Sequence, residues 1–553
     1  MSLSPPNAAL AFMPEGYTTR SGRLMGRQSA TEGMLRALIR HGGLDALHAY
    51  TLAPGQEAGF AAIAGELGAT QPCHAIPPGG FGAVARLGTL CLPGPDLGGL
   101  AAQRALARQD RGFSLVGVTH TLSSLRAMQG ITQLLTAPLH PWDAVVCTSR
   151  AARAMVAALL EAEQARLAER LGATRFPRPA LPLIPLGIET GDFHFPPAMR
   201  AEWRARIGAA EEDFVVLSHG RVSWHAKAHP WPMLAALGRL AARHPGRRIH
   251  VLVVGWTSHP AQETALAEQA RALCPTVRLH RAGGAEPERR PGSWAAADAF
   301  ILLSDNIQET FGLAVIEAMA AGLPVIVSDW DGFKDTVRDG QDGFRIPTLM
   351  APPGTAGDLA LAHATAAVDY DHHLAATTQL VAVDIAAAAQ ALETLLTDPA
   401  RARAMGQAAR LRAGAEYDWS VLIPRHQALW RELAAIRQAA APPARLPAPA
   451  PELADPTQAF QSWPSAHLTA TTPLARDPEA PALLLDQALA LPAAIHPRPD
   501  AARLAQLAHL LAAVPEHGSI TAGKLREALP PAEQPWAGRG ILWLLKTGYL
   551  RAG

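Results

Sequence analysis

Short apolar runs rich in β-branched residues alternate along this chain with longer Ala/Leu segments of helical period. Strand patterns that alternate with helical patterns predict parallel sheets covered by helices. In the first half of the chain the expected strands are 8–13, 46–51, 114–118, 144–148 and 181–185. In the second half they are 214–218, 249–255, 277–280, 299–304 and 324–328. Each half is long enough for one doubly wound domain, so we predict an α/β fold with two Rossmann-like domains that face a cleft.

Two shifts in composition divide the remainder of the chain. After residue 433 the segment IRQAAAPPARLPAPAPELADP is rich in Pro and Ala and poor in core-forming residues, which is typical of an extended linker. From about residue 500, three segments of helical pattern and a short terminal strand follow one another as in a small winged-helix unit. The predicted parts are two Rossmann-like domains at 1–195 and 196–438, a Pro/Ala-rich linker at 439–499 and a small, mainly α, winged-helix-like module at 500–553.

The charge of the chain argues against a nucleic-acid partner. The 553 residues include 49 Lys and Arg and 48 Asp and Glu, which leaves a net charge of +1. The terminal module has six basic and four acidic residues, an excess too small for the basic face that DNA binding needs. We therefore expect no nucleic acid to bind and assign the module a role in packing or protein interaction.

Composition also bears on the class of protein and on its compartment. Hydrophobic residues make up 49% of the chain, which excludes a disordered protein. The four cysteines are widely spaced and form no Cys-x2-Cys pair for zinc or dithiol chemistry. No apolar run reaches the roughly 18 residues of a membrane span, and the first residues lack a signal-peptide pattern. We therefore expect a cytoplasmic protein.

The segment AFILLSDNIQETFGLAVIEAMAAGLPVIVSDWDGF carries the most informative chemistry. A buried strand is expected to end at Ser304, a polar turn then contains Glu309, and a helix is expected over 311–321. The helix N-terminus would leave the amides near Gly312 and Leu313 free to bind a phosphate. Glu317 follows Glu309 by eight residues, and carboxylates on both sides of an anion suggest recognition of hydroxyl groups. In a chain with 48 acidic residues such a pair can also be an ordinary exposed feature.

A second loop combines an arginine with one of the few lysines. The segment DFVVLSHGRVSWHAKAHP predicts a strand that ends before Arg221 and a loop that carries Lys227. Cations beyond a strand end can neutralise the charge that develops on a departing diphosphate. The alternative is a solvated loop, which is less expected because only four lysines occur in the chain.

Candidate residues in the first half are less distinctive. Gly22 and Gly26 lie in a loop before a helical segment, where a glycine loop is often a simple turn. His120 follows the strand FSLVGV and is therefore expected at the carboxyl edge of the first sheet, facing the cleft. A lone histidine is otherwise more often structural.

Taken together, these motifs resemble those of retaining glycosyltransferases with the GT-B fold, in particular glycosyltransferase family 4 (glycosyl transferases group 1). The resemblance extends over most of residues 8–437 and includes the segment GAEYDWSVLIPRHQALW, which is similar to the family's terminal helix that returns to the first domain. It implies transfer of a sugar from a nucleotide sugar to an acceptor hydroxyl, with retention of anomeric configuration and without metal. It also implies that the first domain serves the acceptor and the second the nucleotide sugar.

The resemblance assigns a role to each candidate residue. Arg221 and Lys227 hold the diphosphate, with the amides of Gly312 and Leu313. Glu317 binds the ribose, Glu309 the donor-sugar hydroxyls and His120 the sugar near the reacting carbon. Gly22 and Gly26 belong to the loop that closes on the donor phosphates and the acceptor.

The implied partners are a nucleotide-sugar donor and a glycan or lipid-linked acceptor, with a possible peripheral contact at the inner face of the membrane. Cell-envelope polysaccharide or glycoconjugate synthesis is the usual work of this family. No cofactor and no metal are expected. One departure concerns 329–335, where DWDGFKD stands in place of the family's usual Gly-Gly-x-x-Glu turn at the sugar pocket.

Several alternatives remain open on the sequence. Asp329 and Asp331 form an Asp-x-Asp pair, which binds a divalent ion in the other large glycosyltransferase fold. His363, His372 and His373 lie with two aspartates in an insertion that is expected to be a surface excursion rather than a metal site. The same fold could serve a sugar-nucleotide epimerase, a glycan phosphorylase or a non-catalytic protein that responds to a sugar nucleotide.

Overall fold

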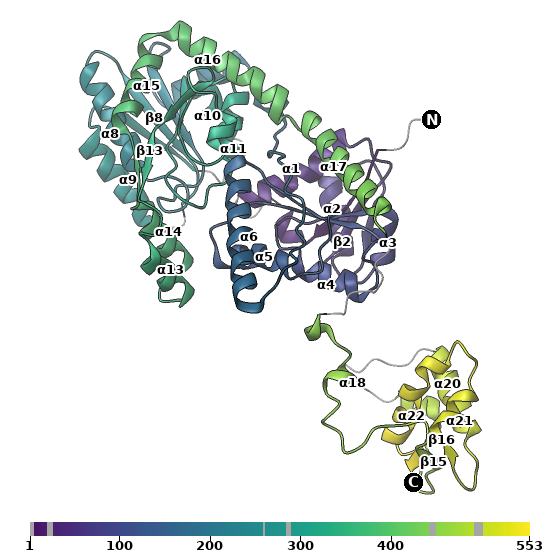
Figure 1. Ribbon diagram of the computed structural model, residues 1–553. Helices are drawn as coiled ribbons and strands as arrows, with labels where there is room; N and C mark the ends of the chain where they lie inside the picture. The colour runs from purple at the N-terminus through teal and green to yellow at the C-terminus, as the bar shows by residue number, and fades with distance from the viewer. Residues whose placement is uncertain (1–4, 19–25, 258–259, 284–288, 442–449, 491–500) are drawn as a thin grey trace. The chain divides into compact units, whose positions relative to one another are not determined.

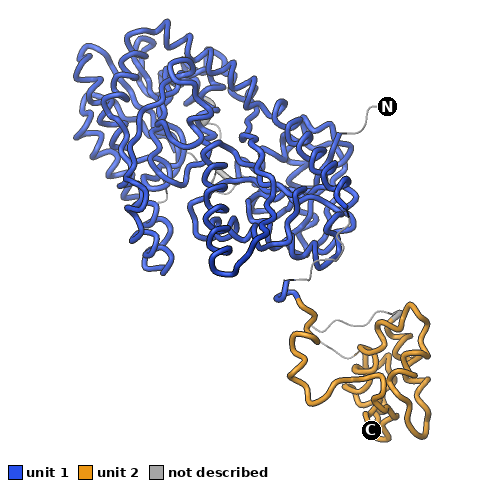
Figure 2. The backbone as a smooth tube through the Cα atoms, in the orientation of Figure 1, with its two compact units in different colours: residues 1–453 blue, residues 454–553 orange. Residues whose placement is uncertain are grey.

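The computed structural model describes residues 5–18, 26–257, 260–283, 289–441, 450–490 and 501–553. They form two compact units, residues 1–453 and residues 454–553 (Figure 2). The predicted α/β class with two Rossmann-like domains is confirmed, because the first unit contains two six-stranded sheets. None of the helices in the described ranges is long and apolar enough to span a membrane.

The first sheet is wholly parallel in the order β3-β2-β1-β4-β5-β6. Its strands are β1 (Ala9–Phe12), β2 (Leu47–Thr51), β3 (Cys73–Ile76), β4 (Thr89–Cys91), β5 (Ser114–Val118) and β6 (Ala144–Val146). Its helices are α1 (Gly26–His41), α2 (Glu57–Glu66), α3 (Phe81–Leu87), α4 (Gly98–Leu106), α5 (Leu125–Thr132) and α6 (Arg150–Leu171).

The second sheet repeats this plan in the order β12-β11-β10-β7-β8-β9. Its strands, also parallel, are β7 (Phe214–His219), β8 (Ile249–Val254), β9 (Arg278–Ala282), β10 (Ala299–Leu302), β11 (Val325–Ser328) and β12 (Gly343–Ile346). The helices that accompany it are α7 (Pro197–Arg206), α8 (Pro230–Arg243), α9 (Pro260–Leu273), α10 (Arg289–Ala296), α11 (Leu313–Ala320), α12 (Phe333–Thr336), α15 (Ile385–Thr397) and α16 (Pro399–Arg412). An insertion after β12 adds β13 (Thr348–Met350), α13 (Gly357–Ala364), α14 (Tyr370–Thr378) and β14 (Val381–Val383).

Both faces of each sheet are buried, as the near-continuous apolar strands predict. Successive strand residues point to opposite faces, so Val216 of β7 belongs to the core under α8 and α15, whereas Val215 belongs to the core under α11. The same alternation divides Leu10 and Ala11 of β1 between the two cores of the first sheet. Helices on both faces leave the carboxyl edges of the sheets free for a site.

One long helix joins the two sheets. Helix α17 (Trp419–Ala439) follows α16 and lies on the first domain (Figure 1), where Trp419, Leu422 and Trp430 are buried with the side chains of β1 and α1. Gln427 Nε2 donates a hydrogen bond to the carbonyl of Gly42 at 2.8 Å. The predicted return of the terminal helix to the first domain is therefore observed.

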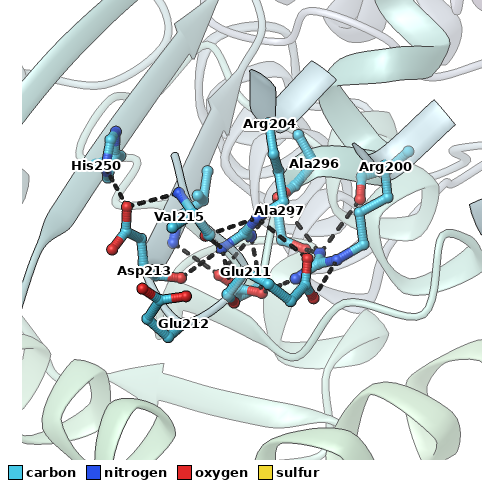
Figure 3. A network of polar contacts seen from close by, with 12 residues as sticks. Arg200, Arg204, Glu211, Glu212, Asp213, Val215, His250, Ala296 and Ala297 are labelled. Carbon is cyan, nitrogen blue, oxygen red and sulfur yellow. Dashed lines mark hydrogen bonds and ion pairs between the residues drawn. The ribbon is translucent and has the colours of Figure 1, made fainter. Parts of the chain in front are cut away.

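A buried network of polar contacts lies at the amino ends of the strands of the second sheet and holds these ends together (Figure 3). Arg204 of α7 is 2% exposed and donates to the carbonyls of Ala296, Ala210 and Asp213 and to the carboxylate of Asp298. Asp213 in turn contacts His250 of β8, with 3.2 Å between Oδ2 and Nε2. Because this cluster lies at the edge remote from the strands' carboxyl ends, it supports the sheet rather than the site.

The second unit is built around a three-stranded antiparallel sheet in the order β16-β15-β17. Its elements are α18 (Pro456–Ala459), β15 (Pro473–Arg476), α19 (Leu485–Ala490), α20 (Ala501–Ala513), β16 (Ile520–Thr521), α21 (Ala522–Glu527), α22 (Ala537–Lys546) and β17 (Leu550–Ala552). The three predicted helices and the terminal strand are present. Strand β15 falls within 439–499, the range predicted as a linker, so the compact unit begins well before residue 500.

The expected strand at 181–185 is not continuous. This segment pairs with β6 and its extension only through isolated bridges, from Ala180 to Ala144 and from Leu183 to Cys147. Pro182 and Pro185 have no N–H to donate, which interrupts the ladder that the apolar pattern suggested.

Candidate active site

The loop after β7 is fixed by two glycines that allow a close approach of the backbone. Gly220 has a φ of +140° and Gly255 a φ of +153°. A Cβ on Gly255 would lie 1.7 Å from the carbonyl oxygen of Gly220, so only glycine fits there. The chain can then carry Arg221 and Lys227 over the carboxyl end of the sheet.

The backbone of Lys227 is bound to the end of β10. Its carbonyl oxygen accepts hydrogen bonds from Ser304 Oγ and from Asn306 Nδ2, each at 2.8 Å. Asn306 Oδ1 also accepts from the backbone N–H of Glu309 at 3.1 Å. The buried side chain of Asn306 therefore fixes the lysine loop and the glutamate turn relative to each other.

Lys227 and Glu309 form an ion pair, with 2.7 Å between Nζ and Oε2. The two side chains are 19% and 14% exposed, so the pair is largely shielded from water. Burial alone would raise the pKa of Glu309. The charge and hydrogen bond of Lys227, with backbone hydrogen bonds from Phe311 and Thr310, lower that pKa below its usual value. Glu309 is therefore ionised at neutral pH.

Arg221 lies beside the same pair. Burial lowers the pKa of its guanidinium, while the nearby groups of Asp371, Tyr370 and Glu309 act in the opposite direction. Its Cζ lies 5.9 Å from the ring centroid of Trp256, which follows β8. Arg221 and Lys227 both line a cavity, together with Ser218, Gly220, His229 and Leu303. The structure thus brings Arg221, Lys227 and Glu309 into one site.

Gly312 precedes helix α11, in a conformation and at a close approach that only glycine allows. It has a φ of +89°, and a Cβ at this position would lie 2.2 Å from Cε1 of Phe333. The helix begins at Leu313 and has eight residues, shorter at both ends than the predicted range 311–321. Glu317 is a half-buried residue of this helix. The span from Glu309 to Glu317 is therefore only partly helical.

The first-domain candidates lie elsewhere. His120 follows β5 and lines a second, mostly apolar cavity with Tyr17, Met34, Trp419 and His426. Gly26 begins α1, whereas Gly22 lies outside the described residues. His120 thus faces a cavity of the first domain, and the second domain supplies the charged groups.

Two further aspartates belong to this region: Asp305 was not predicted as a site residue, and Asp331 was considered only as half of an Asp-x-Asp metal pair. Asp305 lies three residues after the end of β10, and its Oδ1 accepts the backbone N–H of His229 at 3.3 Å. Burial raises the pKa of Asp305 to about 7. Asp331 lies in the turn after β11, and burial raises its pKa to about 7 as well. Asp305 directly follows the predicted strand 299–304, and Asp331 lies three residues after the predicted strand 324–328, but their polar surroundings come from distant segments.

The two Rossmann-like domains touch at the same edge. The guanidinium Nε of Arg150 donates to Asp335 Oδ1 at 2.6 Å, and Ser149 Oγ donates to Asp331 Oδ1 at 3.5 Å. Ser123 Oγ lies 2.7 Å from the hydroxyl of Tyr370 in α14. The insertion that was expected to be a surface excursion therefore reaches the first domain.

The sequence offers two metal alternatives, the pair of Asp329 and Asp331 and the histidines of the insertion. Throughout the described ranges, no group of three or more His, Cys, Asp or Glu side chains could hold a metal ion. His363 and His373 stack on each other at 4.4 Å between ring centroids, and His373 is buried.

Residues 213–371, which contain the ion pair and α11, match the family model described as "Glycosyl transferases group 1". The chain carries a glycosyl transferases group 1 domain. Arg221, Lys227, Glu309, Gly312 and Glu317 all lie within this domain. The recognised resemblance is confirmed for this part of the chain.

Curated relatives of the group 1 domain share a name. The chain is 35% identical over 188 residues to a D-inositol 3-phosphate glycosyltransferase of Nocardia farcinica, an alignment that covers 34% of this chain and 40% of that protein. A protein of the same name from Nocardioides sp. is 30% identical over 258 residues, covering 44% of this chain and 53% of that protein. The chain thus spans about half or less of the relatives it matches. Among solved structures, Anabaena HepE in complex with UDP is 16% identical with a TM-score of 0.48, over 74% of this chain and 98% of that one.

Proposed function

We propose that this protein is a retaining glycosyltransferase, which moves a sugar from a nucleotide-sugar donor to a hydroxyl of an acceptor. The observation that carries the proposal is the shielded pair of Lys227 and Glu309, held at the strand ends within the group 1 domain. A cation and a carboxylate side by side can bind the two parts of a nucleotide sugar, the cation its diphosphate and the carboxylate its sugar. The diphosphate is anionic, and the sugar presents hydroxyl donors.

The diphosphate binds on the cationic side of the pair. Arg221 and Lys227 supply two positive charges at a partly buried position, where charges interact more strongly than in water. The first amides of α11, at Gly312 and Leu313, have no partner within the helix and are available to phosphate oxygens. Glu317, one turn further along α11, binds the ribose.

Glu309 receives the sugar. When Lys227 turns to the diphosphate, the ionised carboxylate of Glu309 needs new hydrogen-bond donors, and the sugar hydroxyls supply them. His120 approaches the sugar from the first domain. The bond from the anomeric carbon to the phosphate oxygen breaks, the acceptor oxygen bonds to the same face of that carbon, and the acceptor proton passes to the departing diphosphate.

The acceptor is a polyol, a glycan or a lipid-linked glycan of the cell envelope. The matched relatives are named for D-inositol 3-phosphate, which makes that compound the first acceptor to test. We place the reaction in the cytoplasm, with peripheral contact to the membrane for a lipid-linked acceptor.

The test is release of nucleoside diphosphate by the purified full-length protein. Sugars activated with UDP, GDP, ADP and dTDP are each incubated with D-inositol 3-phosphate or with a mixed glycan and lipid-linked extract, with and without chelator. We expect release with one donor class only when an acceptor is present, unchanged by chelator, and a product whose anomeric proton coupling matches the donor. Release without acceptor indicates hydrolysis or phosphorolysis, and donor binding without turnover across the panel contradicts an enzymatic role.

A further inference from the structure

Asp331 has a carboxylate oxygen that is buried without a hydrogen-bond partner. Its Oδ2 makes no hydrogen bond, and its Oδ1 accepts a long one from Ser149 Oγ at 3.5 Å. A buried polar atom without a partner is costly, so its presence in a native fold calls for an explanation.

The backbone of Asp331 adopts a conformation that costs conformational free energy for a residue other than glycine. Its φ of +41° makes it one of three non-glycine residues with positive φ in the described part of the chain. The next residue, Gly332, packs so closely that a Cβ there would lie 2.6 Å from the Cα of Phe311 and 2.9 Å from the carbonyl oxygen of Thr310. The turn of Asp331 is therefore pressed against the turn that carries Glu309. Such local strain clusters at functional sites.

The charges around Asp331 exclude an anionic ligand. Burial raises its pKa, and the negative charges of Glu309 and Asp335 raise it further, against hydrogen bonds from Gly332 and Ser149. Arg150, which follows the Ser149 that contacts Asp331, is already paired with Asp335. A phosphate would be repelled here, whereas a neutral hydroxyl donor would satisfy the buried oxygen.

The position of Asp331 relative to the pair of Lys227 and Glu309 indicates which part of a ligand it contacts. Asp331 lies beside Glu309, the carboxylate that receives the sugar in the proposed function, and it touches Ser149 at the start of α6 in the first domain. Sugar hydroxyls between the two domains therefore come within its reach. On the basis of the proposed function, we propose that Asp331 accepts a hydrogen bond from one hydroxyl of the transferred sugar and thereby sets which sugar is accepted.

The test compares Asp331→Gly and Asp331→Asn with the wild type on the identified donor and on its monodeoxy analogues. Both substitutions tolerate positive φ, so both variants should fold. A site that hydrogen-bonds a substrate hydroxyl rejects the analogue that lacks it. We expect kcat/KM of the wild type to fall at least 100-fold for one deoxy position. In Asp331→Gly the penalty at that one position should shrink at least tenfold, and the penalties at the other positions should stay the same.

A matched control is Asp45→Gly, at an exposed position before β2. It should leave the whole deoxy profile unchanged. An identical profile in wild type and Asp331→Gly overturns the role of Asp331 while leaving the transferase intact. If Asp331→Gly lowers kcat/KM equally for the donor and for every deoxy analogue, Asp331 has a purely structural role, and the proposal is overturned as well.

A binding measurement separates this proposal from failure of the proposed function. If the wild type turns over no donor, the thermal shift produced by a nucleotide sugar is compared with that produced by its nucleoside diphosphate. An extra shift from the sugar that is present in wild type and lost in Asp331→Gly supports the contact without catalysis. No extra shift from the sugar in the wild type overturns it.

Discussion

The three carboxyl groups at the site differ in protonation because their neighbours differ. Glu309 contacts the ammonium of Lys227, which lowers its pKa despite burial. Asp305 is buried and Asp331 half-buried, each without a cation of its own, and burial raises the pKa of each to about 7. As the pH rises toward 7, the unfolded state loses its protons first, so each of these two groups makes the folded state less favourable.

Asp331→Asn should stabilise the protein, and more so at higher pH. A carboxyl group whose pKa is higher in the folded state binds more protons folded than unfolded between about pH 4 and pH 7, so stability falls as the pH rises through this window. Asparagine does not ionise, so it removes this pH-dependent loss of stability, and it tolerates the positive φ. We expect the gain in unfolding free energy to be about 1–2 kcal/mol larger at pH 8 than at pH 5, measured by urea unfolding.

The exposed Asp45→Asn variant is the control for that measurement and should show a pH-independent difference near zero. The same stability change for Asp331→Asn at both pH values would contradict the assignment of a raised pKa.

Gly312→Ala should destabilise the protein by about 2–4 kcal/mol. The new Cβ would lie 2.2 Å from Phe333 in a backbone conformation that alanine disfavours. Gly99→Ala, at a helical position with open space around it, should change stability by less than about 1 kcal/mol. Equal effects of the two substitutions in urea unfolding would show that α11 does not need its glycine.

At the scale of elements, the sequence predicts most strands of the two parallel sheets and misses β3, β4 and β12. The apolar runs of β7, β8 and β10 are buried on both faces and were predicted. Strand β3 has a single buried residue at a sheet edge, and β4 has three residues, so neither leaves a periodic pattern. Whether such a strand forms is decided by the elements that pack against it.

The site residues likewise divide into those that a local sequence pattern predicts and those that only long-range contacts place. Arg221, Lys227 and Glu309 were predicted because each follows a recognisable strand or precedes a recognisable helix. The unpartnered oxygen of Asp331 could not be predicted, since it depends on Ser149 and Glu309, which are 182 and 22 residues away in the chain. Contacts of that range follow from the packing of domains.

Helix α17 contributes to the stability of the first domain from far along the chain. Trp430 is 1% exposed and packs in the core shared with β1 and α1. Trp430→Ala should lower the unfolding free energy by about 3–5 kcal/mol. Trp231→Ala, at a position 47% exposed on α8, should cost less than about 1 kcal/mol. Similar losses in the two variants would indicate that α17 is not part of that core.

At the scale of the whole molecule, each compact unit has a core of its own. The core of residues 454–553 includes Leu474 of β15, Leu525 of α21 and Leu544 of α22, all fully buried. The group 1 domain lies wholly in the first unit. Stability of the second unit and turnover at the site should therefore vary independently.

Calorimetry of the full chain should show two transitions. Leu544→Ala removes a buried side chain from the second unit and should lower one transition by several degrees, with the other transition and the rate of nucleoside diphosphate release unchanged. One cooperative transition that moves as a whole would show that the units are energetically coupled.

The central claim is that the pair of Lys227 and Glu309 performs sugar transfer. The most direct measurement is acceptor-dependent release of nucleoside diphosphate by Lys227→Ala and Glu309→Gln, beside the exposed matched controls Lys546→Ala and Glu202→Gln. Loss of transition-state stabilisation predicts turnover about 10²–10³-fold lower in the first two variants, with both controls at the wild-type rate. Wild-type turnover in Lys227→Ala and Glu309→Gln would contradict the account.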